Sequence, residues 1–160
     1  MTASRVLVAL RIAAPPERTF AAFTDEIGSW WRPNGLFRFT GRADGRLAFE
    51  PARPEVPERL VEVGADGERF EIGPVLTWDP PTRLVFGWRQ DGFPPDRATE
   101  VAVRFDAVST GTRVTVEHIG WDALPQEHAT RHGFPLGAFQ QRLAEWWQEL
   151  LRSLDAQLSG

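Results

Sequence analysis

The sequence predicts an α+β domain in which a curved antiparallel sheet of six or seven strands wraps around one long C-terminal helix. Three observations support this fold class. The longest helical pattern, Leu136 to Leu158, carries one apolar stripe and ends the chain. Short alternating segments separated by Gly, Pro and Asp fill most of the preceding chain, as a meander of hairpins requires. Two short helical patterns follow the first strand, so the expected order is β-αα-β(six strands)-α.

The C-terminal helix is predicted from the spacing of its apolar residues. On a helical wheel of about 100° per residue they fall within an arc roughly 140° wide. They are Leu136, Phe139, Leu143, Trp146, Trp147, Leu150, Leu151, Leu154 and Leu158. The opposite side is charged and polar, which excludes a membrane span. Gln140 lies inside the arc, so we expect it either at a rim or facing space that is not fully packed.

The first strand and the two short helices are predicted from residues 5–31. Arg5 to Ile12 alternates apolar and polar residues, the pattern of a half-buried strand. Pro16 can begin a helix, and Thr24 or Asp25 can cap a second one. The inward residues of these two helices are expected to be Phe20, Phe23, Ile27, Trp30 and Trp31.

The middle of the chain predicts the rest of the sheet. The expected strands are Arg46 to Glu50, Leu60 to Val63, Phe70 to Trp78, Leu84 to Trp88, Val101 to Phe105 and Arg113 to His118, and Leu36 to Thr40 is expected to pair weakly at most. Reversals are expected at Ala43 to Gly45, Ala65 to Gly67, Asp79 to Thr82 and Ser109 to Gly111. The residues expected in phase on the longest of these strands are Phe70, Ile72, Leu76 and Trp78. A loop from Asp91 to Asp96 and a short helix between Asp122 and His132 complete the prediction.

Composition restricts the class of protein. With 160 residues, 42% hydrophobic, 25% charged and a net charge of −4, the chain is expected to form one soluble domain over residues 1–160. Mild acidity without a basic run argues against nucleic-acid binding. The absence of cysteine excludes disulfides, thiol catalysis and cysteine-ligated metals. The segment Met1 to Arg11 has no apolar core of signal-peptide length, so a cytoplasmic protein is expected. A monomer or a homodimer is expected.

Several segments together resemble a known superfamily. They are Gly73 to Val75 leading to Trp78 to Pro81, Arg83 to Trp88, Thr99 with Val101 and Val103, Gly111 to Val116, His118 to Trp121, Phe20 with Phe23, and the pair Trp30 and Trp31. The combination resembles the START-like (SRPBCC, Bet v 1-like) helix-grip superfamily, within it the group related to the C-terminal domain of the activator of Hsp90 ATPase. The resemblance spans essentially the whole chain and implies a helix-grip fold that often encloses an apolar cavity. The Trp-His-Trp run of that activator's N-terminal domain is absent here, so the resemblance does not imply stimulation of Hsp90.

The aromatic residues define the candidate binding site. Seven Trp and eleven Phe without any Tyr indicate large apolar surfaces, either a closely packed core or the wall of a cavity. The candidate ligand-binding residues are Trp30, Trp31, Phe49, Trp78, Phe86, Trp88, Phe105, Val116, His118, Phe139, Gln140, Leu143 and Trp146. In the leading hypothesis Trp78, Trp88 and Trp146 form a wall for a flat or elongated apolar molecule. Gln140 or His118 would orient its polar end, and Glu50 is a further polar candidate.

Three functions remain open from the sequence. The first is a carrier or sensor that binds a small hydrophobic or amphipathic molecule. The second is a protein-interaction domain with a packed core, co-chaperone-like or regulatory, that uses its outer surface. The third is an enzyme acting on a cyclic or aromatic substrate, with His118 as a general base beside Glu50 or Glu62. The chain has no nucleophile elbow, phosphate-binding glycine loop or dinucleotide fingerprint, so no catalytic residue and no cofactor are assigned.

A metal site was considered at His128 and His132. The two histidines are four residues apart and share a face if one helix includes both, and His118 or Glu127 could add a ligand. The stretch is charged, is flanked by loops and lacks the Glu that a metalloprotease helix needs. We therefore expect two exposed histidines and no metal.

Overall fold

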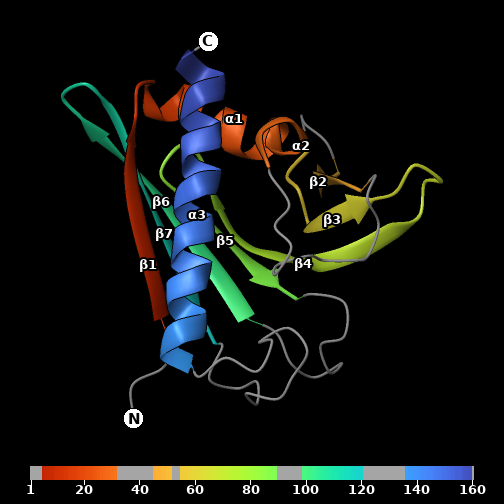
Figure 1. Ribbon diagram of the computed structural model, residues 1–160. Coiled ribbons are helices and arrows are strands. Elements are labelled where there is room, and N and C mark those ends of the chain that lie inside the picture. The colour runs from red at the N-terminus through yellow and green to blue at the C-terminus, as the bar shows by residue number, and fades with distance from the viewer. Residues whose placement is uncertain (1–4, 32–44, 52–54, 90–98, 121–135, 160) are drawn as a thin grey trace.

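Seven strands form one antiparallel sheet in the computed structural model, which describes residues 5–31, 45–51, 55–89, 99–120 and 136–159 (Figure 1). The strands are β1 (Arg5–Ile12), β2 (Arg46–Glu50), β3 (Arg59–Val63), β4 (Arg69–Asp79), β5 (Arg83–Trp88), β6 (Thr99–Val108) and β7 (Gly111–Ile119). Their order in the sheet is β1-β7-β6-β5-β4-β3-β2. Consecutive strands from β2 to β7 are hairpin neighbours, and only β1 crosses over, to pair with β7. The predicted fold class is confirmed.

Three helices lie on one side of this sheet among the described residues: α1 (Pro16–Asp25), α2 (Ile27–Trp30) and α3 (Leu136–Ser159). Pro16 occupies the first turn of α1, where its missing N–H removes no helical hydrogen bond. Phe20 and Phe23 of α1 and Ile27 and Trp30 of α2 are buried, as predicted. The two short helices therefore close one end of the space between α3 and the sheet.

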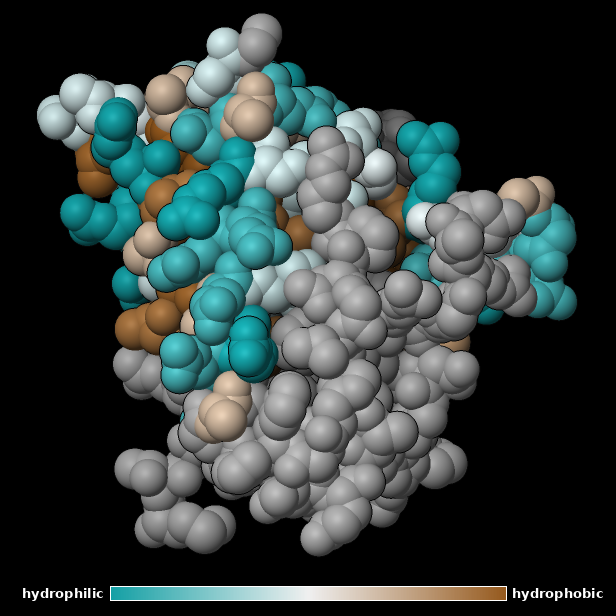
Figure 2. Space-filling model, in the orientation of Figure 1, coloured by the Kyte–Doolittle hydropathy of each residue, from teal (hydrophilic) through white to brown (hydrophobic). Residues whose placement is uncertain are grey.

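The apolar stripe of α3 faces the sheet, as the sequence predicts. Its buried members are Leu143, Trp146, Trp147, Leu150, Leu151 and Leu154. Figure 2 shows hydrophilic side chains along the outward side of the helix. The side chains of Leu136 and Phe139 lie outside the described residues. Burial of one stripe, with solvent on the other side, explains why this sequence forms a helix packed on a sheet.

Polar contacts tie the C-terminal half of α3 to the elements at the start of the chain. Ser153 Oγ donates a hydrogen bond to the carbonyl oxygen of Trp30 at 2.6 Å. Gln157 Nε2 donates to Glu26 Oε1 at 2.7 Å, and the backbone N–H of Ala13 donates to Asp155 Oδ1 at 3.2 Å. These three contacts set the position of α3 along α2.

We expect Ser153→Ala to lower the free energy of unfolding by about 1 kcal/mol, because the part-buried carbonyl of Trp30 loses its hydrogen bond. Urea denaturation measures the loss. Ser109→Ala in the exposed turn between β6 and β7 is the matched control and should change stability by less than about 0.5 kcal/mol. Equal losses in the two variants would contradict a role for the Ser153 hydrogen bond.

Strand β4 is irregular, and one prediction about it is wrong. A Cβ atom on Gly73 would lie 2.0 Å from the carbonyl oxygen of Gly87, so β4 and β5 approach so closely there that a side chain at Gly73 does not fit. The pairing of β4 with β5 then shifts register between Val75 and Thr77. Leu76 is the extra residue at this shift and is 54% exposed, instead of facing inward in phase with Ile72.

The remaining predicted strands and reversals agree with the structure where it describes them. Gly67, in the turn between β3 and β4, has φ of 85°, a conformation that favours glycine. Thr82 N–H donates to the carbonyl oxygen of Asp79 at 2.8 Å and closes the reversal between β4 and β5. The predicted strand Leu36 to Thr40, the loop Asp91 to Asp96 and the helix between Asp122 and His132 lie outside the described residues. So does most of the turn Ala43 to Gly45.

None of the helices within the described ranges is long and apolar enough to cross a membrane.

Candidate functional site

Four tryptophans meet where α3 crosses the end of β5, and we call them the indole cluster: Trp31, Trp88, Trp146 and Trp147. Trp31 directly follows α2, Trp88 ends β5, and the other two lie on α3. The ring centroid of Trp31 lies 5.7 Å from Trp88, 5.5 Å from Trp146 and 5.6 Å from Trp147. The rings meet edge to face or tilted rather than stacked, the arrangement that their quadrupoles favour.

A second aromatic group lies farther along the sheet and consists mainly of phenyl rings. Its members are Phe20, Phe23, Phe49, Trp78, Phe86 and Phe105. Trp30 connects the two groups, with centroid distances of 5.0 Å to Phe23 and 5.6 Å to Trp31. The Trp30 indole N–H also donates to the carbonyl oxygen of Ala22 at 2.9 Å, which fixes this bridging ring.

The predicted wall requires Trp78, Trp88 and Trp146 to lie together. In the structure Trp78 lies apart from the other two. The Trp78 ring packs on Phe20 at 5.0 Å and on Phe49 at 6.3 Å. Trp78 pairs with Leu84 across the β4–β5 ladder, and Trp88 is four residues farther along β5. Four residues of strand span roughly 13 Å, so Trp78 and Trp88 lie at different ends of the interior.

His118 of β7 is fully buried beside the indole cluster and takes part in a hydrogen-bonded chain. Trp147 Nε1–H donates to His118 Nδ1 at 3.2 Å, and His118 Nε2 lies 2.8 Å from Thr99 Oγ1. Because the indole N–H can only donate, Nδ1 accepts and the proton of the neutral ring lies on Nε2. Nε2–H then donates to Thr99 Oγ1, whose hydroxyl donates to the carbonyl oxygen of Trp88 at 3.0 Å.

This chain of hydrogen bonds determines the chemistry of His118. Burial lowers the pKa of His118 to about 3, so the imidazole is neutral at physiological pH. Both ring nitrogens are engaged by Trp147 and Thr99, which leaves neither for a ligand or for a substrate proton in this arrangement. The hydrogen bonds hold the rings of Trp147 and His118 and the backbone of Trp88 in fixed positions.

The other predicted residues have different surroundings. Val116 and Leu143 are fully buried in the core. Gln140 is half-buried and lies seven residues before Trp147 on α3. This spacing places Gln140 on the same stripe, about 10 Å along the helix axis. The side chain of Phe139 is outside the described residues.

Four residues of this region were not among the predicted site residues: Phe20, Phe23, Thr99 and Trp147. The periodicity had already placed Phe20, Phe23 and Trp147 inward, so the signal was present for these three. Thr99 is in phase with Val101 and Val103, but its hydrogen bonds depend on a histidine and a strand end that only the folded sheet brings together.

The two carboxylates considered as partners of His118 lie elsewhere. Glu50 accepts from Arg69 Nε at 2.9 Å and from Arg59 at 3.4 Å, at a hollow lined also by Glu71 and Pro74. Glu62 is buried on β3, and a Cβ atom on Gly45 would lie 2.6 Å from its carboxyl carbon. The side chain of Glu62 therefore leans over the start of β2, away from His118 on β7.

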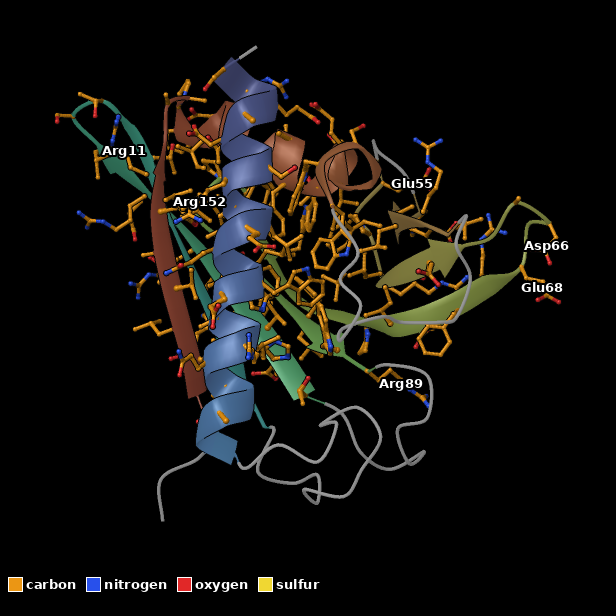
Figure 3. All side chains as sticks on the ribbon, in the orientation of Figure 1. Arg11, Glu55, Asp66, Glu68, Arg89 and Arg152 are labelled. Carbon is orange, nitrogen blue, oxygen red and sulfur yellow. The ribbon has the colours of Figure 1, made fainter. Side chains whose placement is uncertain are left out.

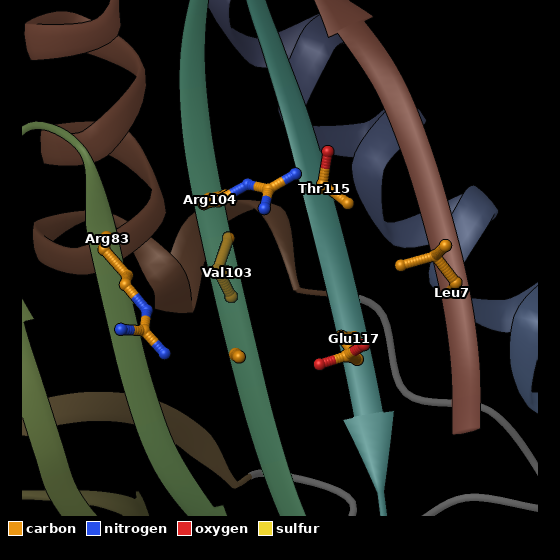
Figure 4. Close-up of a pocket in the computed structure, with 7 residues that line it drawn as sticks. Leu7, Arg83, Val103, Arg104, Thr115 and Glu117 are labelled. Carbon is orange, nitrogen blue, oxygen red and sulfur yellow. The ribbon is translucent and has the colours of Figure 1, made fainter. Parts of the chain in front are cut away.

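A groove of about 480 Å³ lies on the opposite, outer face of the sheet (Figure 4). Arg83 of β5 and Arg104 of β6 are paired directly across the ladder and flank the groove. Leu7 of β1, which is 53% exposed, and Glu117 of β7 lie on its other side. The groove thus combines arginine and glutamate side chains with an exposed apolar one.

Within the described part of the chain, no three His, Asp or Glu side chains gather where they could hold a metal ion. His128 and His132, the pair considered from the sequence, lie outside it.

Solved structures share this fold over nearly the whole chain. The protein MLL2253 of Mesorhizobium loti is 21% identical, with a TM-score of 0.64 and coverage of 97% of this chain and 96% of its own. DynU16, a putative protein of the dynemicin biosynthetic locus, is 19% identical with a TM-score of 0.64, and the match covers 99% of this chain but 48% of DynU16. At these identities the likeness shows the fold alone.

A third structure is more similar in sequence. The anthrahydroquino-γ-pyrone synthase Txn09, solved in complex with the ligand SUM, is 32% identical, with a TM-score of 0.50. The match covers 88% of this chain and 86% of the synthase. No curated protein matches the chain significantly.

The family model of the activator of Hsp90 ATPase homolog 1-like proteins matches residues 13–159. The match includes every described helix and all of the sheet except β1. The chain therefore belongs to the activator of Hsp90 ATPase homolog 1-like family, with the helix-grip fold that its sequence predicts.

Proposed function

We propose that this domain binds a flat, fused-ring aromatic molecule between α3 and the sheet, with the indole cluster as the main contact surface. The observation that carries the proposal is the convergence of Trp31, Trp88, Trp146 and Trp147 from three separate elements onto one site. Aromatic surfaces with few polar groups are what pockets for planar apolar ligands present.

The hydrogen bonds around His118 hold one side of the indole cluster in place. Trp147 is bonded to His118 through its indole N–H, and the carbonyl of Trp88 accepts from Thr99. Trp31 directly follows α2 and is buried, with 7% of its surface exposed. A ligand ring is therefore proposed to lie against Trp31 and Trp146, with Trp88 and Trp147 behind them.

The comparisons support the ligand class. Txn09, at 32% identity, is a synthase named for a product that contains an anthrahydroquinone and a γ-pyrone, both planar ring systems. This relationship is compatible with a planar polycyclic ligand here. We propose binding, as a carrier or sensor, rather than catalysis by His118, because that histidine is neutral and engaged at both nitrogens.

We expect 1,8-dihydroxyanthraquinone to quench the intrinsic tryptophan fluorescence and to raise the melting temperature. At a ligand concentration 100 times Kd, the added stability should be about 2.7 kcal/mol. Trp146→Phe should weaken binding about tenfold or more, since it removes part of the contact surface. Trp78→Phe, in the separate phenyl group, is the matched control and should leave Kd within about twofold of wild type. Absence of any fluorescence or melting change with this probe and with a panel of flavonoids and fatty acids would contradict the proposal.

A protein-interaction function has one observation in its favour, the groove on the outer face of the sheet. Arg83 and Leu7 lie on opposite sides of it. A partner that fits would present an acidic side chain to Arg83 next to an apolar one for Leu7. The double variant R83E/L7D would remove such binding without altering the response to the anthraquinone.

A further inference from the structure

Arg89 lies immediately after Trp88, at the end of β5, and its side chain contacts Phe70 of β4. Its backbone N–H donates to the carbonyl oxygen of Ile72 at 2.9 Å, which continues the pairing of β5 with β4 by one residue. The guanidinium carbon is 5.9 Å from the ring centroid of Phe70, within the range of a cation–π contact. Figure 3 shows Arg89 at the end of the sheet where β5 stops.

The strand register shows which face of the sheet this guanidinium occupies. Phe70 of β4 pairs with Glu62 of β3, which pairs with Leu47 of β2. Directly paired residues of antiparallel strands point to the same face. Leu47 belongs to the buried core, and α2 packs against its strand, because a Cβ atom on Gly28 would lie 3.0 Å from the Leu47 carbonyl oxygen. Phe70, and with it the guanidinium of Arg89, therefore lies on the inner face that α2 and α3 cover.

Arg89 is partly exposed, and among the described residues its guanidinium contacts the Phe70 ring but no carboxylate. Its Nε atom is buried and has no hydrogen-bond partner, and no side-chain hydrogen bond or ion pair of Arg89 occurs in the part of the chain that the structure describes. An arginine is always protonated in a protein, so the buried Nε–H is a donor of a charged group and has no acceptor. Such a donor destabilises the unliganded fold unless an acceptor supplied from outside satisfies it.

The buried carboxylate nearest in the register does not fill this role. Glu62 is directly opposite Phe70, but its carboxyl group leans over Gly45 at the start of β2, and Glu62 has interactions of its own. Glu62 therefore does not supply an acceptor for the Nε–H of Arg89.

We propose that Arg89 recognises an anionic oxygen group, such as a carboxylate, at one end of the aromatic ligand. The inference rests on the proposed function and narrows it, from flat aromatic molecules in general to those that carry an acidic group. Arg89 directly follows Trp88 in the chain, so the charged donor and the indole cluster belong to the same end of β5. A planar guanidinium lying over Phe70 matches a carboxylate in geometry and keeps its orientation when the ligand binds.

Two fluorescent probes with the same aromatic skeleton test the inference. One is 8-anilinonaphthalene-1-sulfonate, which carries an anionic group, and the other is N-phenyl-1-naphthylamine, which does not. We expect Arg89→Met to weaken binding of the sulfonate probe about 10- to 100-fold, the effect of losing a charge-assisted hydrogen bond. Binding of the neutral probe should stay within about twofold of wild type, and Arg89→Lys should retain part of the affinity for the sulfonate.

Arg83→Met, which removes an exposed arginine on the outer face, is the matched control and should change neither Kd. The melting temperature of each variant establishes that it is folded at the assay temperature. If the wild type binds both probes and Arg89→Met weakens neither, or weakens both equally, the role of Arg89 is refuted while the proposed function stands. If the wild type binds neither probe and no anthraquinone, the proposed function fails and the inference fails with it.

Discussion

Acidification should destabilise this protein through one residue, His118. The imidazole is neutral and fully buried in the folded state, where its pKa is lowered to about 3 by desolvation. In the unfolded chain it titrates near its ordinary pKa of about 6.5. Below that pH the unfolded state binds a proton that the folded state excludes, so the stability associated with His118 is complete above pH 6.5 and is lost as the pH falls towards 3. The loss amounts to about 1.4 kcal/mol per pH unit and to about 5 kcal/mol in total.

The free energy of unfolding, measured by urea denaturation between pH 7 and pH 4, tests this expectation against His118→Gln. A glutamine does not titrate, so the variant should be less stable at pH 7 and should lose stability less steeply with acid. His128 and His132 remain in both proteins and cancel in the comparison. Parallel curves for the two proteins would show that His118 does not exclude its proton. If the variant does not fold, the ring resonances of His118 in the wild type provide the same test, since they should show no titration above pH 4.

The His118 hydrogen bonds also show where sequence analysis stops. Alternation along Arg113 to His118 correctly placed the histidine inward, because a period of two is a local property of a strand. Its hydrogen-bond partners Thr99 and Trp147 lie 19 and 29 residues away. No local pattern indicates that a hydroxyl, an imidazole and an indole will meet. The sequence therefore suggested a candidate general base, whereas the fold supplies a neutral ring with both nitrogens engaged.

The predictions for strands β4 and β5 succeed where the pairing of the strands is regular and fail where it is not. The inward phase of Leu84, Phe86 and Trp88 held because β5 pairs regularly with β6. Leu76 was misplaced because the close approach of Gly73 and Gly87 and the following register shift depend on two strands at once. Trp78 of β4 and Trp88 of β5 point to the same face of the sheet but lie at different heights along it. Alternation predicts the face of a residue, not its distance from residues of other strands. Arg89 gave no signal at all, since its importance lies in a partner that it lacks.

Replacing Leu143 with alanine should lower the free energy of unfolding by about 2–5 kcal/mol. Leu143 is fully buried on the stripe of α3, one turn before Trp146 and Trp147, so truncation removes apolar burial beneath the indole cluster and leaves a void. Urea denaturation measures the effect. Arg142→Ala, on the exposed side of the same turn, is the control and should stay within about 0.5 kcal/mol of wild type.

The size of the Leu143→Ala effect carries information beyond the position of the helix. The cost of a truncation rises with the volume that the surrounding side chains leave unfilled, so a loss near the upper bound indicates rigid, close packing around Leu143. A loss near the lower bound indicates neighbours that relax into the space, as an interior able to admit a planar ligand requires. A loss below about 0.5 kcal/mol would show that Leu143 is not packed against the sheet at all, and the arrangement of α3 over the indole cluster would then be wrong.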